Sequence, residues 1–297
     1  RARVLRVDGG GRPMTVDVAI VGAGLAGLAC ARDLASRGVE CAVFEASDAV
    51  GGRVRTDRVE GFQIDRGFQV FLTAYPEARR VLDLDALDLH AFDPGARVWL
   101  GDRLHRLSDP LRRPAQALPT LLADVGSLVD KLRVLRLRQS VTRGPLEALW
   151  ARPETTTESA LRDRYGFSER MVDRFFRPFL GGVFLDASLQ ESSRAFEFCV
   201  RMFSLGDAAV PSAGMQAIPE QLASRLPGGT VRLGARVSSV APGEVRVADG
   251  QAVRCRACWC CPGRHPSPRT TTATCCPAHR HSPFHPRRQA CWLWWSS

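Results

Sequence analysis

The stretch from Val16 to Glu45 restricts the fold of this chain more than any other segment. Residues 16–21 form a β-branched run of the kind that makes a buried parallel strand. Three glycines at G-x-G-x-x-G spacing follow, and apolar residues then recur at helical spacing up to Gly38. A second strand is predicted over residues 40–44, which completes a β–α–β unit. Glu45 lies about 20 residues beyond the glycines, where a carboxylate can accept hydrogen bonds from a ribose.

The glycines fit a turn that binds the diphosphate of a dinucleotide. Gly22 permits the tight strand-to-helix turn, Gly24 lets the diphosphate approach the backbone, and Gly27 lets the helix pack on the strand. The helix N-terminus offers free N–H groups and the positive end of the helix dipole. The predicted phosphate-binding turn consists of Gly22, Ala23, Gly24, Leu25, Ala26 and Gly27.

A second motif follows the acid. The pattern E-x(5)-G-G-R-x-x-T is matched by Glu45, Gly51, Gly52, Arg53 and Thr56. This segment resembles the second dinucleotide motif of the superfamily of flavin-dependent amine oxidases, phytoene desaturases and protoporphyrinogen oxidases. The resemblance implies that a second backbone loop wraps around the diphosphate of FAD. Ala46, beside the acid, joins the expected cofactor-binding residues.

The resemblance extends to two further segments. Residues 62–69 resemble the strand and turn that approach the isoalloxazine ring in this family, which adds Arg66, Gly67, Phe68 and Gln69 to the expected cofactor-binding residues. Val237 matches the position whose backbone contacts the adenine. No catalytic acid or base is predicted, because Lys131, the only lysine, matches no motif of the family.

The resemblance covers about residues 14–253 and implies an α/β fold. We expect a discontinuous, incomplete Rossmann-like FAD-binding domain, a parallel sheet with helices, over residues 14–75 and 211–253. A mainly helical α+β substrate domain is expected to be inserted over residues 76–210. Residues 1–13 are expected to be a disordered extension, and residues 254–297 a disordered basic tail rich in Cys, Trp and Pro.

The implied chemistry is hydride transfer from a substrate C–H bond to flavin N5, as in a desaturase or an amine oxidase. The substrate is expected to be small and either apolar or an amine. Two alternatives stay open. One is a NAD-dependent dehydrogenase, which Glu45 permits and Gly51-Gly52-Arg53 disfavours. The other is a truncated, non-catalytic remnant of a flavoprotein.

The net charge of +10 would favour a nucleic-acid or membrane partner if it were spread over the chain. However, seven arginines and no acidic residue follow Asp249, and residues 1–13 carry the rest of the excess. The enzyme-like part is neutral, so we expect no nucleic-acid partner. A cytoplasmic location is predicted, because no segment resembles an export signal or a membrane span. The oligomeric state is not predicted.

A helix with an apolar stripe is predicted over residues 121–138. The stripe consists of Leu121, Leu122, Val125, Leu128, Val129, Leu132 and Leu135, and basic residues lie near its end. The stripe can pack on a core beneath a solvated face, and the basic residues can favour a helix C-terminus. Alternatively, a basic amphipathic helix can lie on a membrane surface. Both interpretations stay open, and the second allows peripheral membrane contact.

The composition changes after Gly250, where Cys, Trp, Pro, Arg and His alternate without a sustained period. Cys255 and Cys258 with His279, His281 and His285 could ligate zinc, but their spacing is irregular for a finger, so no metal is predicted. A basic aromatic tail that binds single-stranded nucleic acid is a weaker alternative. We favour an out-of-frame translation, because Cys-Trp-Cys-Cys can be encoded by codons that, read one base earlier, give an apolar residue followed by Leu-Val-Leu, as in a buried strand.

Overall fold

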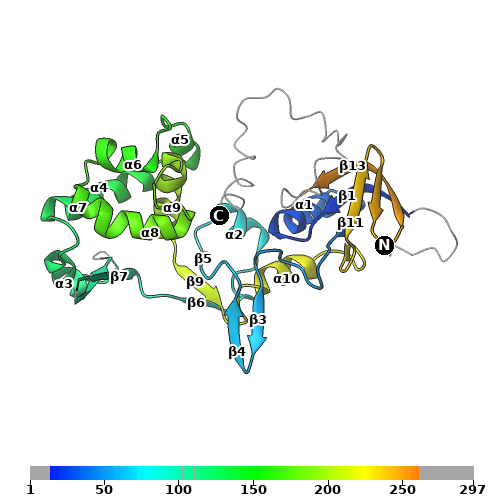
Figure 1. Ribbon diagram of the computed structural model, residues 1–297, viewed down its shortest axis with the longest axis horizontal. Coiled ribbons are helices and arrows are strands. Elements are labelled where there is room, and N and C mark those ends of the chain that lie inside the picture. The colour runs from blue at the N-terminus through cyan, green and yellow to red at the C-terminus, as the bar shows by residue number, and fades with distance from the viewer. Residues whose placement is uncertain (1–13, 102, 110–111, 261–297) are drawn as a thin grey trace. The chain divides into compact units, whose positions relative to one another are not determined.

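The computed structural model describes residues 14–101, 103–109 and 112–260. These residues fall into two compact units, the first made of residues 14–71, 79–90 and 210–260 and the second of residues 72–78 and 91–209. The first unit is built on a sheet and the second mainly on helices, as Figure 1 shows. The predicted fold class, a Rossmann-like α/β domain with a mainly helical insertion, is confirmed.

A six-stranded sheet organises the first unit. Its strand order is β10 (Val231–Arg232), β2 (Cys41–Phe44), β1 (Met14–Val21), β13 (Ala252–Cys260), β12 (Glu244–Val247) and β11 (Val237–Ala241). The first four strands are parallel, and β12 and β11 are antiparallel to their neighbours. In Figure 1, β1 and β13 lie beside each other. Since β1 stands between β2 and β13, the sheet changes direction of winding there, which is where such sheets bind ligands.

The predicted β–α–β unit forms as β1, α1 (Leu25–Ser36) and β2. The middle of β1 and all of β2 are buried, which explains why both strands are nearly continuous apolar runs. Helix α1 contacts β2 and α10 (Ala217–Ser224). The helix ends before Gly38, which has a φ of +73° and no atom within 4 Å of an added Cβ. Gly38 therefore stops the helix by its backbone conformation rather than by packing.

Strand β13 corrects the predicted start of the tail. Residues 254–260 were expected to be disordered, but they continue the sheet in parallel with β1, from Met14 opposite Val253 to Val21 opposite Cys260. The overlooked signal is an alternation: Val253 and Cys255 are buried, whereas Arg254 and Arg256 are exposed. This period of two is typical of a strand even where arginine and cysteine supply the residues. The rest of the tail lies outside the described residues.

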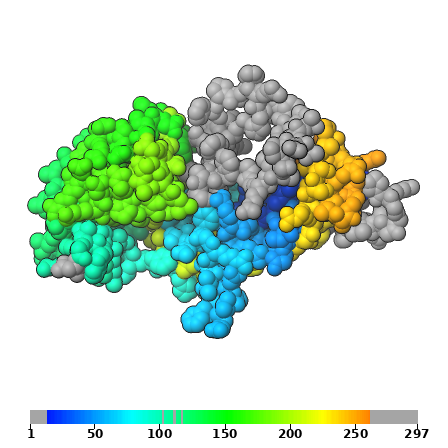
Figure 2. Space-filling model, viewed as in Figure 1, coloured from blue at the N-terminus to red at the C-terminus, as the bar shows by residue number. Residues whose placement is uncertain are grey.

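The remaining strands of the chain are short. A two-stranded hairpin, β3 (Thr56–Val59) and β4 (Phe62–Asp65), follows the second glycine motif and projects from the first unit in Figures 1 and 2. A three-stranded sheet has the order β5 (Phe71–Leu72), β9 (Ala208–Pro211) and β6 (Leu89–Ala91). A second hairpin consists of β7 (Gly95–Leu100) and β8 (Arg103–Ser108). Helix α2 (Pro76–Val81) lies between β5 and β6 in the sequence.

Helices make up most of the second unit. They are η1 (Pro114–Gln116), α3 (Ala117–Leu122), α4 (Leu128–Thr142), α5 (Leu146–Trp150), α6 (Thr157–Ser159), η2 (Ala160–Arg164), α7 (Glu169–Met171), η3 (Val172–Phe176), α8 (Arg177–Phe184) and α9 (Ser193–Leu205). The green residues of Figure 2, which include α4 to α9, form one continuous body. Its core contains Leu137, Leu161, Phe176, Leu180 and Phe196, and the rings of Phe176 and Phe196 meet edge to face at 6.2 Å.

The predicted apolar helix over residues 121–138 is wrong in its bounds, and its stripe is mostly exposed, since Val125 alone of the seven predicted residues is buried in the core. Two helices form instead, because Ser127 caps α4 in a reciprocal pair with Asp130. Asp130 is fully buried and accepts hydrogen bonds from the backbone and hydroxyl of Ser168, which turns that face of α4 inward. Leu122 is consequently 76% exposed and Leu132 66% exposed. Within the described ranges, none of the helices combines the length and the apolar character that crossing a membrane requires.

Candidate functional site

Two glycine-rich loops meet at the carboxyl end of β1. The N–H of Gly51 donates a hydrogen bond to the carbonyl of Ala23 at 2.8 Å, and Gly24 and Gly51 form an isolated parallel bridge. Gly51 has a φ of +114°, and an added Cβ would collide with the carbonyl of Val54 and lie 2.9 Å from Pro219 Cγ. Only glycine fits here. The structure thus brings the two predicted motifs together through their backbones.

The first turn leaves the position predicted for a phosphate open. Gly22 has a φ of +98°, and its N–H donates to the carbonyl of Phe44 at 2.8 Å, so the turn is tied to the neighbouring strand. Gly24 has a φ of −70°, and no atom lies within 4 Å of an added Cβ. No side chain caps α1, so the N–H groups of its first turn can face a ligand. Leu25, Ala26 and buried Gly27 form that first turn.

Glu45 stands at the end of β2 and reaches the first turn. Its Oε2 accepts a hydrogen bond from the N–H of Ala23 at 2.8 Å, and its Oε1 accepts from the backbone and hydroxyl of Ser47, both at 2.9 Å. Two carboxylate oxygens offer about four acceptor positions, so one remains for a ribose hydroxyl. Sequence reasoning missed Ser47, which fixes the orientation of the acid. Ala46 is exposed beside it.

The second motif continues into a cluster of three residues. The guanidinium of Arg53 lies 5.8 Å from the centre of the Phe68 ring, a distance at which a cation and an aromatic face attract each other. An added Cβ at Gly67 would lie 3.1 Å from the carbonyl of Arg53, so a side chain there would press on the loop. Gln69 is exposed and follows this cluster.

Arg66 faces a partner on its own hairpin. Its Nε and Nη2 donate to the two carboxylate oxygens of Asp57, at 2.5 and 2.6 Å. This bidentate pair lowers the pKa of Asp57 and raises the pKa of Arg66. The pair with Asp57 uses the Nε and Nη2 edge of the guanidinium, so a flavin could be reached only by the remaining Nη1 side. Contact between Arg66 and a flavin remains a prediction.

Thr56 joins the second motif to the segment before α10. Its hydroxyl donates to Asp65 at 2.5 Å and accepts from the N–H of Gln216 at 3.0 Å, while its own N–H donates to the Gln216 side chain at 3.1 Å. An added Cβ at Gly214 would lie 2.5 Å from Thr56 Cγ2, so the segments are in close contact. Thr56 thus positions the loop. Asp65 and Gln216 were missed, because their partners are 9 and 160 residues away in sequence.

Val237 begins β11 and lies beside the loop that follows β2. The N–H of Ala235 donates to the carbonyl of Glu45 at 2.8 Å, and the N–H of Gly234 donates to the carbonyl of Ser47 at 2.9 Å. Residues 234–237 therefore run next to the acid, at the edge of the candidate site. Contact between Val237 and an adenine remains a prediction.

Of the five residues considered as zinc ligands, the structure describes Cys255 and Cys258, both on β13. Cys255 is buried in the apolar core of the sheet, and the described residues hold no group of three or more His, Cys, Asp or Glu side chains suited to a metal ion. The histidines proposed as ligands lie outside the described residues.

Comparisons with known proteins agree with this geometry. A predicted flavin-containing monoamine oxidase of Mycobacterium tuberculosis is 58% identical over 55 residues, which are 18% of this chain and 12% of that protein. Coproporphyrinogen III oxidase of Propionibacterium freudenreichii is 31% identical over 175 residues, 56% of this chain and 31% of that protein. The structure of a putrescine oxidase bound to putrescine superposes with a TM-score of 0.59 at 22% identity, over 83% of this chain and 58% of that chain.

The chain therefore spans less than two thirds of these relatives, and the structural likeness concerns the fold. The family described as flavin containing amine oxidoreductase matches residues 25–265, well over half of the chain. The match supports FAD as the cofactor and leaves the nicotinamide alternative without support. This chain belongs to the flavin containing amine oxidoreductase family.

Proposed function

We propose that this chain is an FAD-dependent oxidoreductase that oxidises a small amine or apolar substrate. The observation that carries the proposal is the backbone hydrogen bond between Gly51 and Ala23. This bond holds the two glycine loops next to each other, beside the position proposed for the FAD diphosphate. The open space at Gly24 supports the fit, because a diphosphate needs backbone that no Cβ shields. The family match and the amine and porphyrinogen oxidases among the relatives support the same reaction class.

The residues present fit FAD in the following way. Residues 22–27 and 51–53 would surround the diphosphate, and the carboxylate of Glu45 would hold the ribose. Thr56 would keep the second loop in place through Gln216. Arg53, Phe68 and their neighbours 66–69 would lie toward the flavin, and Val237 toward the adenine. These residues bind and orient, and no side chain among them is assigned as an acid or base.

When bound, the flavin accepts a hydride from a substrate C–H bond. An amine that gave up a hydride from carbon and a proton from nitrogen would become a product with a C=N bond, and its two electrons would pass on to an external electron acceptor. What this chain contributes is orientation and the exclusion of competing reactions.

Cofactor retention tests the proposal. The full chain would be purified without denaturant, passed through gel filtration, and examined for flavin absorbance near about 450 nm. We expect a yellow protein whose absorbance bleaches when a primary amine or a reduced porphyrin precursor is added without oxygen. A folded protein that releases all its FAD would contradict the assignment and favour a non-catalytic remnant.

We also propose that α3 and α4 touch a membrane surface. The exposed apolar side chains of these helices are Leu118, Leu121, Leu122, Leu128, Val129, Leu132 and Leu135. Lys131 supports the arrangement, because its ammonium donates to the carbonyls of Leu121 and Ala123 and so links the two helices. A stripe of this size on one helix pair favours an apolar partner. The cytoplasmic location predicted above is compatible with such contact.

Vesicle flotation tests the membrane contact. Vesicles of phosphatidylcholine with phosphatidylglycerol should carry the chain upward in a density gradient, and Leu122→Ser with Leu132→Ser should abolish this. Both leucines are more than half exposed, so the fold should survive the substitutions. Flotation that the double variant leaves unchanged, or a chain that self-associates through this face and ignores vesicles, would contradict the proposal.

A further inference from the structure

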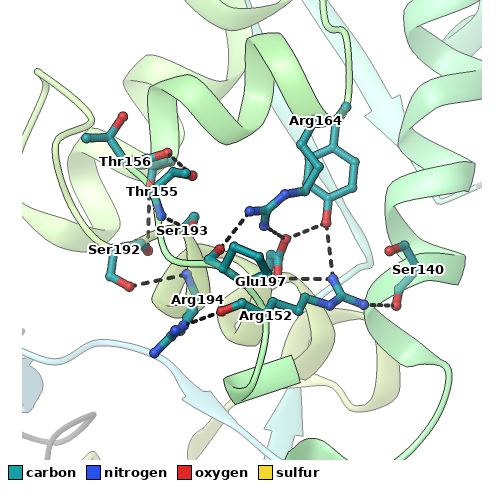
Figure 3. A network of polar contacts seen from close by, with 12 residues as sticks. Ser140, Arg152, Thr155, Thr156, Arg164, Ser192, Ser193, Arg194 and Glu197 are labelled. Carbon is teal, nitrogen blue, oxygen red and sulfur yellow. Dashed lines mark hydrogen bonds and ion pairs between the residues drawn. The ribbon is translucent and has the colours of Figure 1, made fainter. Parts of the chain in front are cut away.

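A buried carboxylate on α9 is linked to the end of η2 and to the segment that follows α5, as Figure 3 shows. Glu197 on α9 is fully buried and accepts from Arg152 at 3.0 Å, from Arg164 at 2.7 Å and from the hydroxyl of Tyr165 at 2.6 Å. Two guanidinium groups thus share one carboxylate. Because Arg152 and Arg164 carry two positive charges and Glu197 carries one negative charge, the network has a net charge of about +1.

A cavity of about 320 Å³ opens on this network. Its lining consists of Arg136, Ser140, Arg152, Pro153, Arg164 and Tyr165. The lining contains three arginines and no acidic side chain, and Glu197 behind it neutralises one of them. The volume lies at the small end of the range for ligand sites, which suits a compact ligand or a headgroup.

The arginines still have N–H groups to offer. Arg152 donates to Glu197, Tyr165 and the carbonyl of Ser140, which holds its guanidinium rigidly at the wall. Arg164 is held in the same way by Glu197 and the carbonyl of Pro153. Arg136 is exposed and makes no hydrogen bond or ion pair within the described part of the chain. Two oriented cations and one unpaired cation therefore face one space.

We propose that this cavity binds a phosphate group. Guanidinium forks donate parallel hydrogen bonds to phosphate oxygens, and positions fixed in advance lose less freedom on binding. A phosphate would compensate the charge that Glu197 leaves over, and Arg136 would close over it. The phosphate group can belong to a small phosphorylated molecule or to a lipid headgroup. A headgroup is within reach of a membrane-bound chain, because Arg136 lies one turn beyond exposed Leu132 on α4.

Calorimetric titration of the full chain with inorganic phosphate tests the site. We expect saturable binding of one phosphate per chain, and about tenfold weaker binding for Arg136→Gln, because a charge-assisted pair is lost. Arg143→Gln is the matched control: it removes the same charge from an exposed arginine at the end of the same helix, away from the cavity lining. This control should bind phosphate like the unchanged chain.

Thermal unfolding followed by circular dichroism would first establish that both variants fold. Vesicles containing phosphatidic acid then distinguish the two sources of phosphate. If the vesicles compete with inorganic phosphate, the natural ligand is a lipid headgroup. If the vesicles do not compete, the ligand is a small phosphorylated molecule. Both outcomes require that phosphate binds in this cavity. The absence of saturable binding, or equal weakening by Arg136→Gln and Arg143→Gln, would overturn the proposal, because charge alone would then explain the attraction.

Discussion

The carboxylate of Glu45 accepts a hydrogen bond of 2.8 Å from the backbone N–H of Ala23. This bond connects the end of β2 to the glycine turn after β1, so the acid and the turn hold one another before any cofactor arrives. Ser47 fixes the second oxygen of the same carboxylate. The acid is thereby oriented toward the candidate site by its own protein.

Replacing Glu45 with glutamine should weaken FAD binding about tenfold, because hydrogen bonds to a charged acceptor become bonds to a neutral amide. The free energy of unfolding without FAD should fall by about 1 kcal/mol for the same reason. Fluorescence titration with FAD and urea unfolding measure the two effects. Glu40→Gln serves as control, since its exposed side chain accepts no hydrogen bond within the described residues. Equal loss of affinity in both variants would contradict a specific role for Glu45.

Two glycine substitutions should separate folding from cofactor binding. Gly24→Ala meets open space at an ordinary φ of −70°, so the free energy of unfolding should fall by no more than about 1 kcal/mol, the typical cost of alanine at a helix N-cap. Its added methyl would nevertheless occupy the place proposed for the diphosphate, and FAD should be lost on gel filtration. Retention of FAD by the Gly24→Ala variant would contradict the proposed position of the diphosphate.

Gly51→Ala should behave in the opposite way and unfold the loop itself. Its φ of +114° and its contact with Val54 predict a loss of at least about 2 kcal/mol in the free energy of unfolding. Urea unfolding of the cofactor-free chain measures this loss. A Gly51→Ala variant as stable as the unchanged chain would show that the loop does not need glycine there.

The sequence allowed the first unit to be predicted where chemistry restricts each residue. Gly22, Gly24 and Glu45 have roles that few other residues can fill, so their spacing alone indicated the β–α–β unit and the acid beside it. The family resemblance supplied the second loop, but not its attachment. Contacts such as Thr56 with Gln216 cross 160 residues, and no local pattern encodes them.

The errors have physical causes too. Strand β13 was missed because its Cys, Trp and Arg content was interpreted as the start of an aberrant tail, although buried and exposed positions alternate from Val253 to Arg256. The apolar stripe of residues 121–135 was assigned to one helix because its spacing is helical. The capping pair of Ser127 and Asp130 interrupts it, and buried Asp130 decides which face turns inward.

Asp130 should make the second unit sensitive to acid. Burial would raise its pKa, but hydrogen bonds from the backbone and hydroxyl groups of Ser168 and Ser127 outweigh it and lower the pKa from 3.8 to about 2. The unfolded carboxyl therefore binds a proton more readily than the folded one. Its stabilising contribution is present above pH 4 and is lost as the pH falls toward about 2.

Asp130→Asn should consequently lower the free energy of unfolding by about 2 kcal/mol at pH 7 and leave it unchanged near pH 2. Urea unfolding at several pH values measures this difference. Asp85→Asn is the control, because the Asp85 side chain is exposed and has no hydrogen-bond partner among the described residues. A deficit that stays constant from pH 7 to pH 2 would show that lost hydrogen bonds, and not the charge, explain the effect.

Glu197 should be the side chain on which the second unit depends most. Replacing it with glutamine leaves Arg152 and Arg164, both largely shielded from water, without their shared counter-charge. Removing one partner of a buried ion pair costs about 3–5 kcal/mol, so the variant should unfold at much lower urea concentration. Glu147→Gln, at an exposed position on α5, should change the free energy of unfolding by less than about 0.5 kcal/mol.

Tyr165 provides a second prediction, since burial and its hydrogen bond to Glu197 raise its pKa to about 12. The stability it contributes is present below pH 10 and is lost as the pH rises toward 12. Tyr165→Phe should remove that alkaline loss, and a variant that keeps it would place the titrating group elsewhere.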